Sequence, residues 1–254
     1  DVFRDLARQD SPLGQLTPFS AYTFGYAFAE RLLEESSEDG EEVTVCIGKD
    51  PRPHGGVLGE WLARGISDGG ATVLDTGIAT TPSMFEFCRS NLCFGAIMIT
   101  ASHLPADRNG LKFFTKKDGG FTKSDINDLA NRATTIARTH RHTSYPLLNP
   151  NHHPAPQKVD YFTHYADTIQ SAIISEMCAD LEECDTGTLS LPLAGLRVVL
   201  NAGHGSGSLF YKILHDLGAD VSGSSGITPD GTFPNGIPNP ESKDMVYMTT
   251  KLCE

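Results

Sequence analysis

Residues 43–74 read VTVCIGKDPRPHGGVLGEWLARGISDGGATVL, and this stretch decides the fold class. Val43–Ile47 is a short β-branched run of the kind that is buried in parallel sheets, and Ala71–Leu74 follows as a second strand. Between them, Gly48–Gly56 is rich in Gly and Pro, which predicts a loop at the carboxyl end of the first strand, and Val57–Ser67 predicts a helix. A strand, a helix and another strand in this order are typical of a parallel α/β sheet.

The same alternation continues on both sides of this stretch. Thr17 and Pro18 provide a helix cap and a favourable first helical residue, so a helix is expected through Leu33. Downstream, the pattern predicts a helix over Pro82–Ser90, strands over Ala96–Thr100 and Lys112–Thr115, and a helix from the capping box Thr122–Asp125 to about Arg138.

A second domain is expected after a proline-rich linker. The four prolines between Arg141 and Gln157 cannot sustain a helix. The pattern then starts again, with a helix over Lys158–Leu181, a strand over Leu196–Leu200, a helix over Ser206–Leu217 and a strand over Ala219–Ser222. We therefore expect an α/β protein with two consecutive α/β/α three-layer domains and mostly parallel mixed sheets, at residues 1–145 and 158–254.

The composition excludes several classes of protein. Hydrophobic residues make up 39% of the 254 residues, which is enough for a packed core and excludes global disorder. The net charge of −12 would repel a nucleic-acid backbone, so no nucleic-acid partner is expected. No apolar run reaches the roughly 18 residues of a membrane span, so no membrane partner is expected either. Six cysteines without a CxxC pair favour reduced thiols, and we expect a cytoplasmic or plastid location.

The segment from Thr100 to Lys112, TASHLPADRNGLK, carries the strongest chemical signal. It follows an apolar strand, and loops at the carboxyl ends of such strands bind ligands in open α/β sheets. Ser102 could act there as a nucleophile or phosphate carrier, with His103 and Lys112 neutralising phosphoryl oxygens or moving a proton. The alternative is a serine-containing turn with incidental cations. On the earlier strand-end loop, Arg52 could orient a phosphate or could be a surface arginine.

This segment resembles the active-site loop of the α-D-phosphohexomutases, the phosphoglucomutase and phosphomannomutase superfamily. The usual form is T-[AG]-S-H-N-P followed closely by N-G-x-K. Ser102 matches the serine that is phosphorylated in that family, and His103, Asn109 and Lys112 match at the expected spacing. One position departs from the pattern, because Leu104 stands where Asn is usual, which leaves the identity of the hexose open.

The resemblance extends over most of the chain. Further matching segments are Leu16–Pro18 with its helix, Gly48–Arg52, Asp75–Pro82, Asn201–Gly207 and Pro229–Pro240. The resemblance implies that residues 1–145 are phosphohexomutase domain I and residues 158–254 are domain II, incomplete at its C-terminal end. Domains III and IV are then absent, and they are the expected protein partners of this chain.

The resemblance implies a reaction in which a phosphate moves between the 1- and 6-positions of a hexose phosphate. Phospho-Ser102 donates its phosphoryl group, a bisphosphate forms, and the other phosphate returns to Ser102. His103 and Lys112 would be catalytic, Arg52 and Asn109 would bind substrate phosphate, and a glucose 1,6-bisphosphate-type activator would load the serine.

The family's Mg²⁺ is held by this serine phosphate and by three aspartates of a D-x-D-x-D-R loop, which has no match here. Ser102 is therefore the one expected metal-binding residue of the chain, and we expect the 254-residue piece to lack activity although its parent is an enzyme. Two alternatives remain. A noncatalytic sugar-phosphate-binding or regulatory protein could share the architecture, and a serine-dependent phosphatase would release phosphate without isomer exchange.

Overall fold

The computed structural model describes residues 16–36, 42–117, 119–140, 155–178 and 191–253. They form two compact units. The first runs up to Ala101 and continues from Asp107 to Val159, and the second contains Ser102–Ala106 and the chain from Asp160 onward. No helix in the described part is long and apolar enough to span a bilayer.

The first unit is built on a six-stranded mixed sheet with the order β5-β4-β3-β1-β2-β6. Its strands are β1 (Thr44–Lys49), β2 (Thr72–Ile78), β3 (Gly95–Ile99), β4 (Leu111–Thr115), β5 (Gly119–Gly120) and β6 (Gln157–Lys158). β1 pairs in parallel with β2 and β3, whereas β4 returns antiparallel beside β3. The predicted α/β class with a mostly parallel mixed sheet is confirmed.

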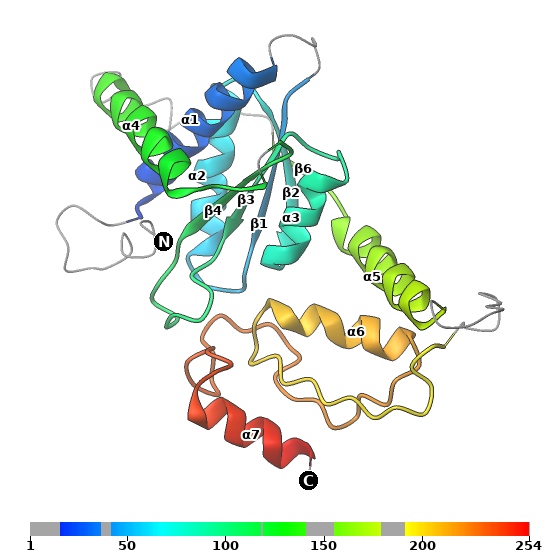
Figure 1. The fold of residues 1–254 in the computed structure, drawn as a ribbon. Coiled ribbons are helices and arrows are strands. Elements are labelled where there is room, and N and C mark those ends of the chain that lie inside the picture. The colour runs from blue at the N-terminus through cyan, green and yellow to red at the C-terminus, as the bar shows by residue number, and fades with distance from the viewer. Residues whose placement is uncertain (1–15, 37–41, 118, 141–154, 179–190, 254) are drawn as a thin grey trace. The chain divides into compact units, whose positions relative to one another are not determined.

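Helices cover both faces of this sheet. They are α1 (Pro18–Ser36), α2 (Gly55–Asp68), α3 (Thr81–Arg89) and α4 (Lys123–His140). Figure 1 shows α1, α2 and α4 on one face and α3 on the other. The caps follow from the sequence: Thr17 and Ser20 bond reciprocally at the start of α1, and Thr80 and Ser83 form a capping box at α3.

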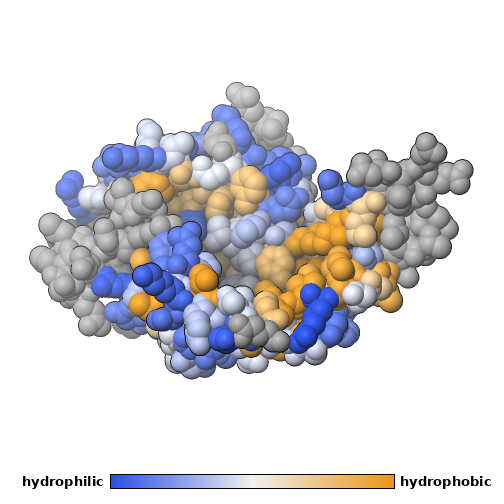
Figure 2. All heavy atoms as spheres, turned by 60° about the horizontal axis from the view of Figure 1, so that its bottom comes forward, coloured by the Kyte–Doolittle hydropathy of each residue, from blue (hydrophilic) through white to orange (hydrophobic). Residues whose placement is uncertain are grey.

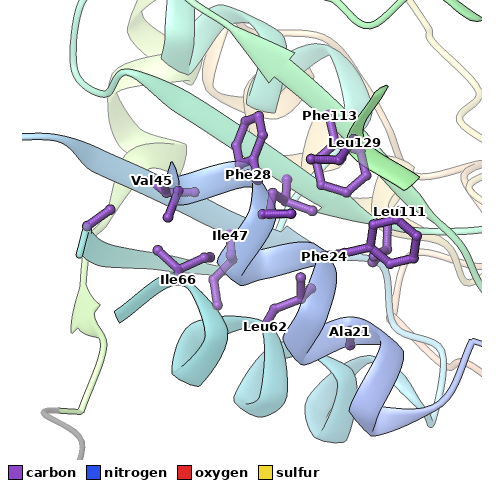
Figure 3. Packing of buried hydrophobic residues seen from close by; sticks show 14 of the residues in the cluster. Ala21, Phe24, Phe28, Val45, Ile47, Leu62, Ile66, Leu111, Phe113 and Leu129 are labelled. Carbon is purple, nitrogen blue, oxygen red and sulfur yellow. The ribbon is translucent and has the colours of Figure 1, made fainter. Parts of the chain in front are cut away.

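The core lies between the sheet and helices α1, α2 and α4. Alternate strand residues such as Val45 and Ile47 point to this side, where they pack with Phe28 and Leu62 (Figure 3). The ring of Phe28 lies 5.2 Å from that of Phe113. These side chains have almost no exposed surface, so their burial supplies most of the driving force for folding of this unit.

Helices α1 and α2 approach each other closely because glycines line their contact. A Cβ on Gly65 would lie 2.0 Å from the carbonyl oxygen of Tyr22, and one on Gly25 would lie 2.5 Å from that of Leu62. Both distances are shorter than any real Cβ contact, so larger residues would push the helices apart.

The second unit contains α5 (Tyr161–Cys178), the 3-10 helix η3 (Ser206–Ser208), α6 (Leu209–Asp216) and α7 (Lys243–Cys253). The strands expected over Leu196–Leu200 and Ala219–Ser222 are present only as isolated parallel bridges, Arg197 with Asp220 and Asn201 with Ser225. The ladder is interrupted because the Leu200 amide donates to the Ser224 hydroxyl, while Ser224 itself closes a turn onto Val221.

The helix expected from Lys158 begins three residues later. Gln157 and Lys158 instead extend the sheet as β6, parallel to β2, and Asp160 caps α5 by accepting hydrogen bonds from Thr163. The expected linker therefore ends in a strand of the first unit. Most of that linker, and residues 179–190, lie outside the described residues; the domain limits 1–145 and 158–254 stay a prediction.

Candidate functional site

The carboxyl ends of β1 and β3 lie side by side, and the residues that follow them form a buried cluster of polar side chains. The Asp50 amide donates to the carbonyl of Ile99 (3.1 Å), which joins the two strand ends. The Asp50 carboxylate accepts a hydrogen bond from the hydroxyl of Thr100 (2.6 Å) and one from Arg52 Nε (2.9 Å). All three residues are buried, so the carboxylate and the guanidinium compensate each other's lost hydration.

Arg52 also fixes the far end of the loop between β3 and β4. Its Nη1 donates to the carbonyl of Arg108 (2.9 Å), and Thr100 N donates to the carbonyl of Gly110 (2.9 Å). The base of the loop is therefore closed by bonds at both ends. The Arg52 side chain presents no solvent-exposed surface, so it is not a surface arginine. This geometry favours a positioning role for Arg52, and its predicted contact with a substrate phosphate stays a prediction.

Asn109 lies in the same closed base. It is 3% exposed, and its Oδ1 accepts a hydrogen bond from the amide of Gly110 (2.9 Å). Its Nδ2 is buried without a partner among the described residues. A buried donor without an acceptor costs about 1–3 kcal/mol, so such groups commonly have a functional or structural reason.

Ser102 lies directly after this base, on the loop of residues 102–106 that groups with the second unit. It is half-buried, and its φ of 55° lies in the left-handed region that favours glycine. A non-glycine residue there stores strain on the order of 1–2 kcal/mol, and strained residues cluster at functional sites. His103, its neighbour, is exposed to solvent.

Lys112 reaches the same edge of the sheet from β4. It lies opposite Met98 in the antiparallel register and is half-buried. Its Nζ donates to the hydroxyl of Thr81, the first residue of α3, at 3.5 Å. A cavity of about 220 Å³ opens beside Lys112, with Thr81, Thr100 and Gly110 in its wall. The rest of the wall is largely apolar and includes Leu111, Phe113 and Phe121, so Lys112 supplies its charged group.

The described residues do not by themselves fit a magnesium ion. Mg²⁺ requires near-octahedral coordination by about six oxygens, usually with at least one or two carboxylates. Among the residues described here, no three His, Cys, Asp or Glu side chains are close enough to hold a metal. The metal-binding role of a phosphate on Ser102 stays a prediction.

Sequence reasoning missed Asp50, Thr100 and Thr81, which now prove to be neighbours of the predicted residues. Asp50 and Thr100 each come directly after the observed strands β1 and β3, and their position near the carboxyl ends of the predicted strands was the available signal. Thr81 had no such signal, because its contact with Lys112 joins residues 31 positions apart in the sequence.

Comparison with known proteins places this geometry in a family. The sequence profile of the phosphoglucomutase/phosphomannomutase α/β/α domain I matches residues 5–140. Phosphoglucosamine mutase from Symbiobacterium thermophilum is 32% identical over 231 residues, which cover 89% of this chain and 46% of that protein. The enzyme of the same name from Carboxydothermus hydrogenoformans is 30% identical over 95% of this chain and 49% of its own length. The chain thus spans about half the length of the curated relatives it matches.

Solved structures agree in fold. A phosphoglucomutase/phosphomannomutase family protein from Burkholderia thailandensis matches 97% of this chain and 49% of its own, with a TM-score of 0.68 and 22% identity. Parafusin, a phosphoglucomutase from Paramecium, matches 89% of this chain and 43% of its own, with a TM-score of 0.62 and 16% identity. By its domain I profile and its relatives, the chain belongs to the phosphoglucomutase/phosphomannomutase family of α-D-phosphohexomutases.

Proposed function

We propose that the protein containing this chain is a phosphohexomutase that uses Ser102 as its phosphate carrier and exchanges the 1- and 6-phosphates of a hexose. The observation that carries this proposal is the strained backbone of Ser102, three residues after the end of β3 in a loop whose base is closed by Asp50 and Arg52. A closed base and a strained backbone restrict the conformations of the loop that carries the hydroxyl, and restricted placement is what a group-transfer step requires.

The proposed reaction has two related steps. A free hydroxyl of the hexose phosphate attacks the phosphorus of phospho-Ser102, so that a new oxygen–phosphorus bond forms while the bond to Ser102 Oγ breaks. The hydroxyl proton leaves to a basic side chain, and Ser102 Oγ takes up a proton. The bisphosphate then turns around, and Ser102 Oγ gives its proton to a basic side chain and attacks the other phosphorus. The bond from that phosphorus to the sugar oxygen breaks and the oxygen takes up a proton, which restores phosphoserine and yields the isomer.

The local cations have separate tasks in this scheme. Lys112 lies on a rigid strand beside a cavity, which suits a group that neutralises phosphoryl oxygens as charge develops. His103 is exposed on the loop next to Ser102, which suits a group that moves a proton to and from bulk solvent. Asn109 carries a buried donor that could hold either the loop or a substrate oxygen.

We further propose that the remaining requirements lie outside this chain. The relatives are about twice as long, and the D-x-D-x-D-R motif expected for the Mg²⁺ ligands is not in the 254 residues. When bound, Mg²⁺ would neutralise charge on the transferring phosphoryl group. The chain alone is then inactive, and the choice among glucose, mannose and glucosamine phosphates is made by residues elsewhere in the protein. A glucose 1,6-bisphosphate-type activator would load Ser102.

The test is tandem mass spectrometry of the whole protein encoded by the gene, after incubation with glucose 1,6-bisphosphate and Mg²⁺. One phosphate on Ser102 is expected. The Ser102→Ala protein should gain none, whereas Ser124→Ala, a change at an exposed serine of α4, should leave the phosphate in place. A phosphate that persists in Ser102→Ala would remove this serine from its role.

Phosphorus NMR with glucose 1-phosphate, mannose 1-phosphate and glucosamine 1-phosphate then separates the possible activities. Formation of a 6-phosphate supports the mutase and identifies the sugar. Release of inorganic phosphate without isomer exchange would instead indicate a phosphatase. Neither product from any of the three sugars would indicate a noncatalytic protein.

A further inference from the structure

A second polar pocket lies in the first unit, between helix α2 and the sheet. Its volume is about 340 Å³, and residues of α2 form one wall while β1, β2 and the segment before β6 form the other. It shares no lining residue with the site around Ser102, Arg52, Asn109 and Lys112. Its volume falls in the range of small-molecule pockets, at the lower end.

Lys49 is the cation in this pocket that is best placed to bind an anionic ligand. It is the last residue of β1 and is half-buried, yet its ammonium group makes no hydrogen bond or ion pair with any residue that the structure describes. A half-buried cation that makes no direct hydrogen bond is incompletely compensated for its lost hydration. An anion in the pocket would offset this loss.

The neighbouring carboxylate of Asp75 attracts Lys49 through its charge, but its hydrogen bonds go to other donors. Asp75 forms an ion pair with Lys158 and accepts a hydrogen bond from the amide of Gly77 (2.7 Å). Burial alone would raise the pKa of Asp75, but these two donors and the nearby charge of Lys49 hold it below its usual value. Arg64 also lines the pocket, so three cations face two carboxylates, Asp75 and Glu60, in a protein whose net charge is −12.

Two glycines keep the α2 wall of the pocket open. A Cβ on Gly56 would meet nothing within 4 Å, and one on Gly59 would meet only Ile99 Cδ1, at an ordinary contact distance of 3.5 Å. Gly65 on the same helix differs, because the close approach of α1 requires it. A glycine inside a helix costs up to about 1 kcal/mol relative to alanine. At Gly59, in the helix interior, packing does not require glycine, and both glycines leave space in the pocket.

We propose that this pocket binds a small phosphate monoester of a polyol, at a site separate from Ser102. The phosphate would lie against Lys49 and Arg64, because an ammonium and a planar guanidinium together match the oxygens of a phosphate group. The hydroxyls would donate to the carboxylate of Glu60, which lies on the exposed side of the pocket and has no ion pair among the described residues. This site goes beyond the proposed mutase function and does not depend on it.

The experiment is an NMR titration of the ¹⁵N-labelled 254-residue chain with glycerol 3-phosphate. Saturable shifts of the Gly56 and Gly59 amides are expected. Lys49→Met should weaken this binding at least about tenfold, whereas the matched change Lys123→Met, at an exposed lysine of α4, should leave it unchanged. Gly59→Ala should weaken binding while raising the melting temperature, a combination that a folding defect would not produce.

Two further titrations, with inorganic phosphate and with glycerol, separate the sources of affinity. The proposal is supported if inorganic phosphate and glycerol each bind more weakly than glycerol 3-phosphate. Equal affinity for inorganic phosphate would overturn the part of it that concerns the polyol. The whole proposal fails if Gly56 and Gly59 do not shift, if Lys49→Met binds as the unchanged chain does, or if the shifts appear only at Asn109 and Gly110, which would place the ligand at the Ser102 site.

Discussion

The two units of the chain differ in how completely they bury their apolar side chains. In the first unit, both faces of a continuous sheet are covered by helices, and Phe28, Leu62 and Ile97 have no exposed surface. Nine large hydrophobic side chains of the described residues are exposed, and seven of them belong to the second unit: Met177, Leu191, Leu196, Ile227, Ile237, Val246 and Tyr247. Figure 2 shows apolar surface, in orange, reaching solvent.

This difference indicates where rigidity is available for chemistry. Asp50, Thr100 and Lys112 stand at the ends of strands, or within strands, whose other residues are locked in the core. The second unit is held instead by isolated bridges and turns, which bury less apolar surface per residue. We therefore expect the base of the Ser102 loop to be the stable part of the site, and the predictions below test this contrast.

The largest effect is expected at the contact of α1 with α2. Gly65→Ala should lower the free energy of unfolding by about 4 kcal/mol, because its Cβ would lie 2.0 Å from the Tyr22 carbonyl oxygen and the helices would have to separate. Urea unfolding, monitored by the fluorescence of the single tryptophan Trp61, measures this change. The matched control is Gly56→Ala on the same helix, which should be neutral or slightly stabilising. Equal effects of the two changes would contradict the close approach of α1 and α2 at Gly65.

The next effect concerns the buried pair at the strand ends. Asp50→Asn should cost about 3 kcal/mol, because it leaves the guanidinium of Arg52 buried without its counter-charge. Thr100→Val removes one hydrogen bond to Asp50 and should cost about 1 kcal/mol. Urea denaturation at neutral pH measures both changes. If Asp50→Asn costs no more than Thr100→Val, the base of the loop is not held by this ion pair.

The fold of the first unit could be predicted largely from the sequence because its signals are local. The β-branched run at Val43–Ile47, the cap at Thr17 and the capping box at Thr122 each act within a few residues, and each has its predicted element. β6 could not be predicted in this way. Gln157 and Lys158 are polar, and only their pairing with Leu74 and Asp75 makes them a strand.

The site shows the same division between local and distant signals. The residue types in the loop from Thr100 to Lys112, together with the family resemblance, led to the prediction of phosphate chemistry, which stays a prediction. The burial of Arg52 and its bond to Arg108 were not predictable, because they join residues 56 positions apart. The strands predicted in the second unit are reduced to isolated parallel bridges for a related reason, since the hydroxyl of Ser224 takes the place of a backbone partner of Leu200.

A smaller effect should separate the two units in hydrogen exchange. The amides of Cys46 and Ile97 lie in the middle of the continuous sheet, whereas those of Val198 and Ala202 belong to the interrupted ladder of the second unit. We expect the second pair to exchange at least about tenfold faster, because local opening there exposes less buried apolar surface. Exchange of the 254-residue chain at neutral pH, read by NMR, measures the four rates. Equal protection would show that the two units open together.

The smallest effect is a pH dependence in the first unit, at the start of α4. Hydrogen bonds from Thr122 and the ion pair with Arg31 lower the pKa of Asp125 to about 2. Because the carboxyl ionises more readily in the folded chain, its contribution to stability is complete above the unfolded pKa of about 3.9 and is lost as the pH falls from there toward 2. Asp125→Asn should therefore be less stable than the unchanged chain at pH 6, by under about 1 kcal/mol because solvent screens the charge, and the difference should shrink by pH 3.

Urea midpoints at both pH values measure this difference in stability. The control is Asp167→Asn, a change at an exposed carboxylate of α5 in the second unit. A difference that stays constant between pH 6 and pH 3 would assign the effect to the shape of the side chain and not to its charge.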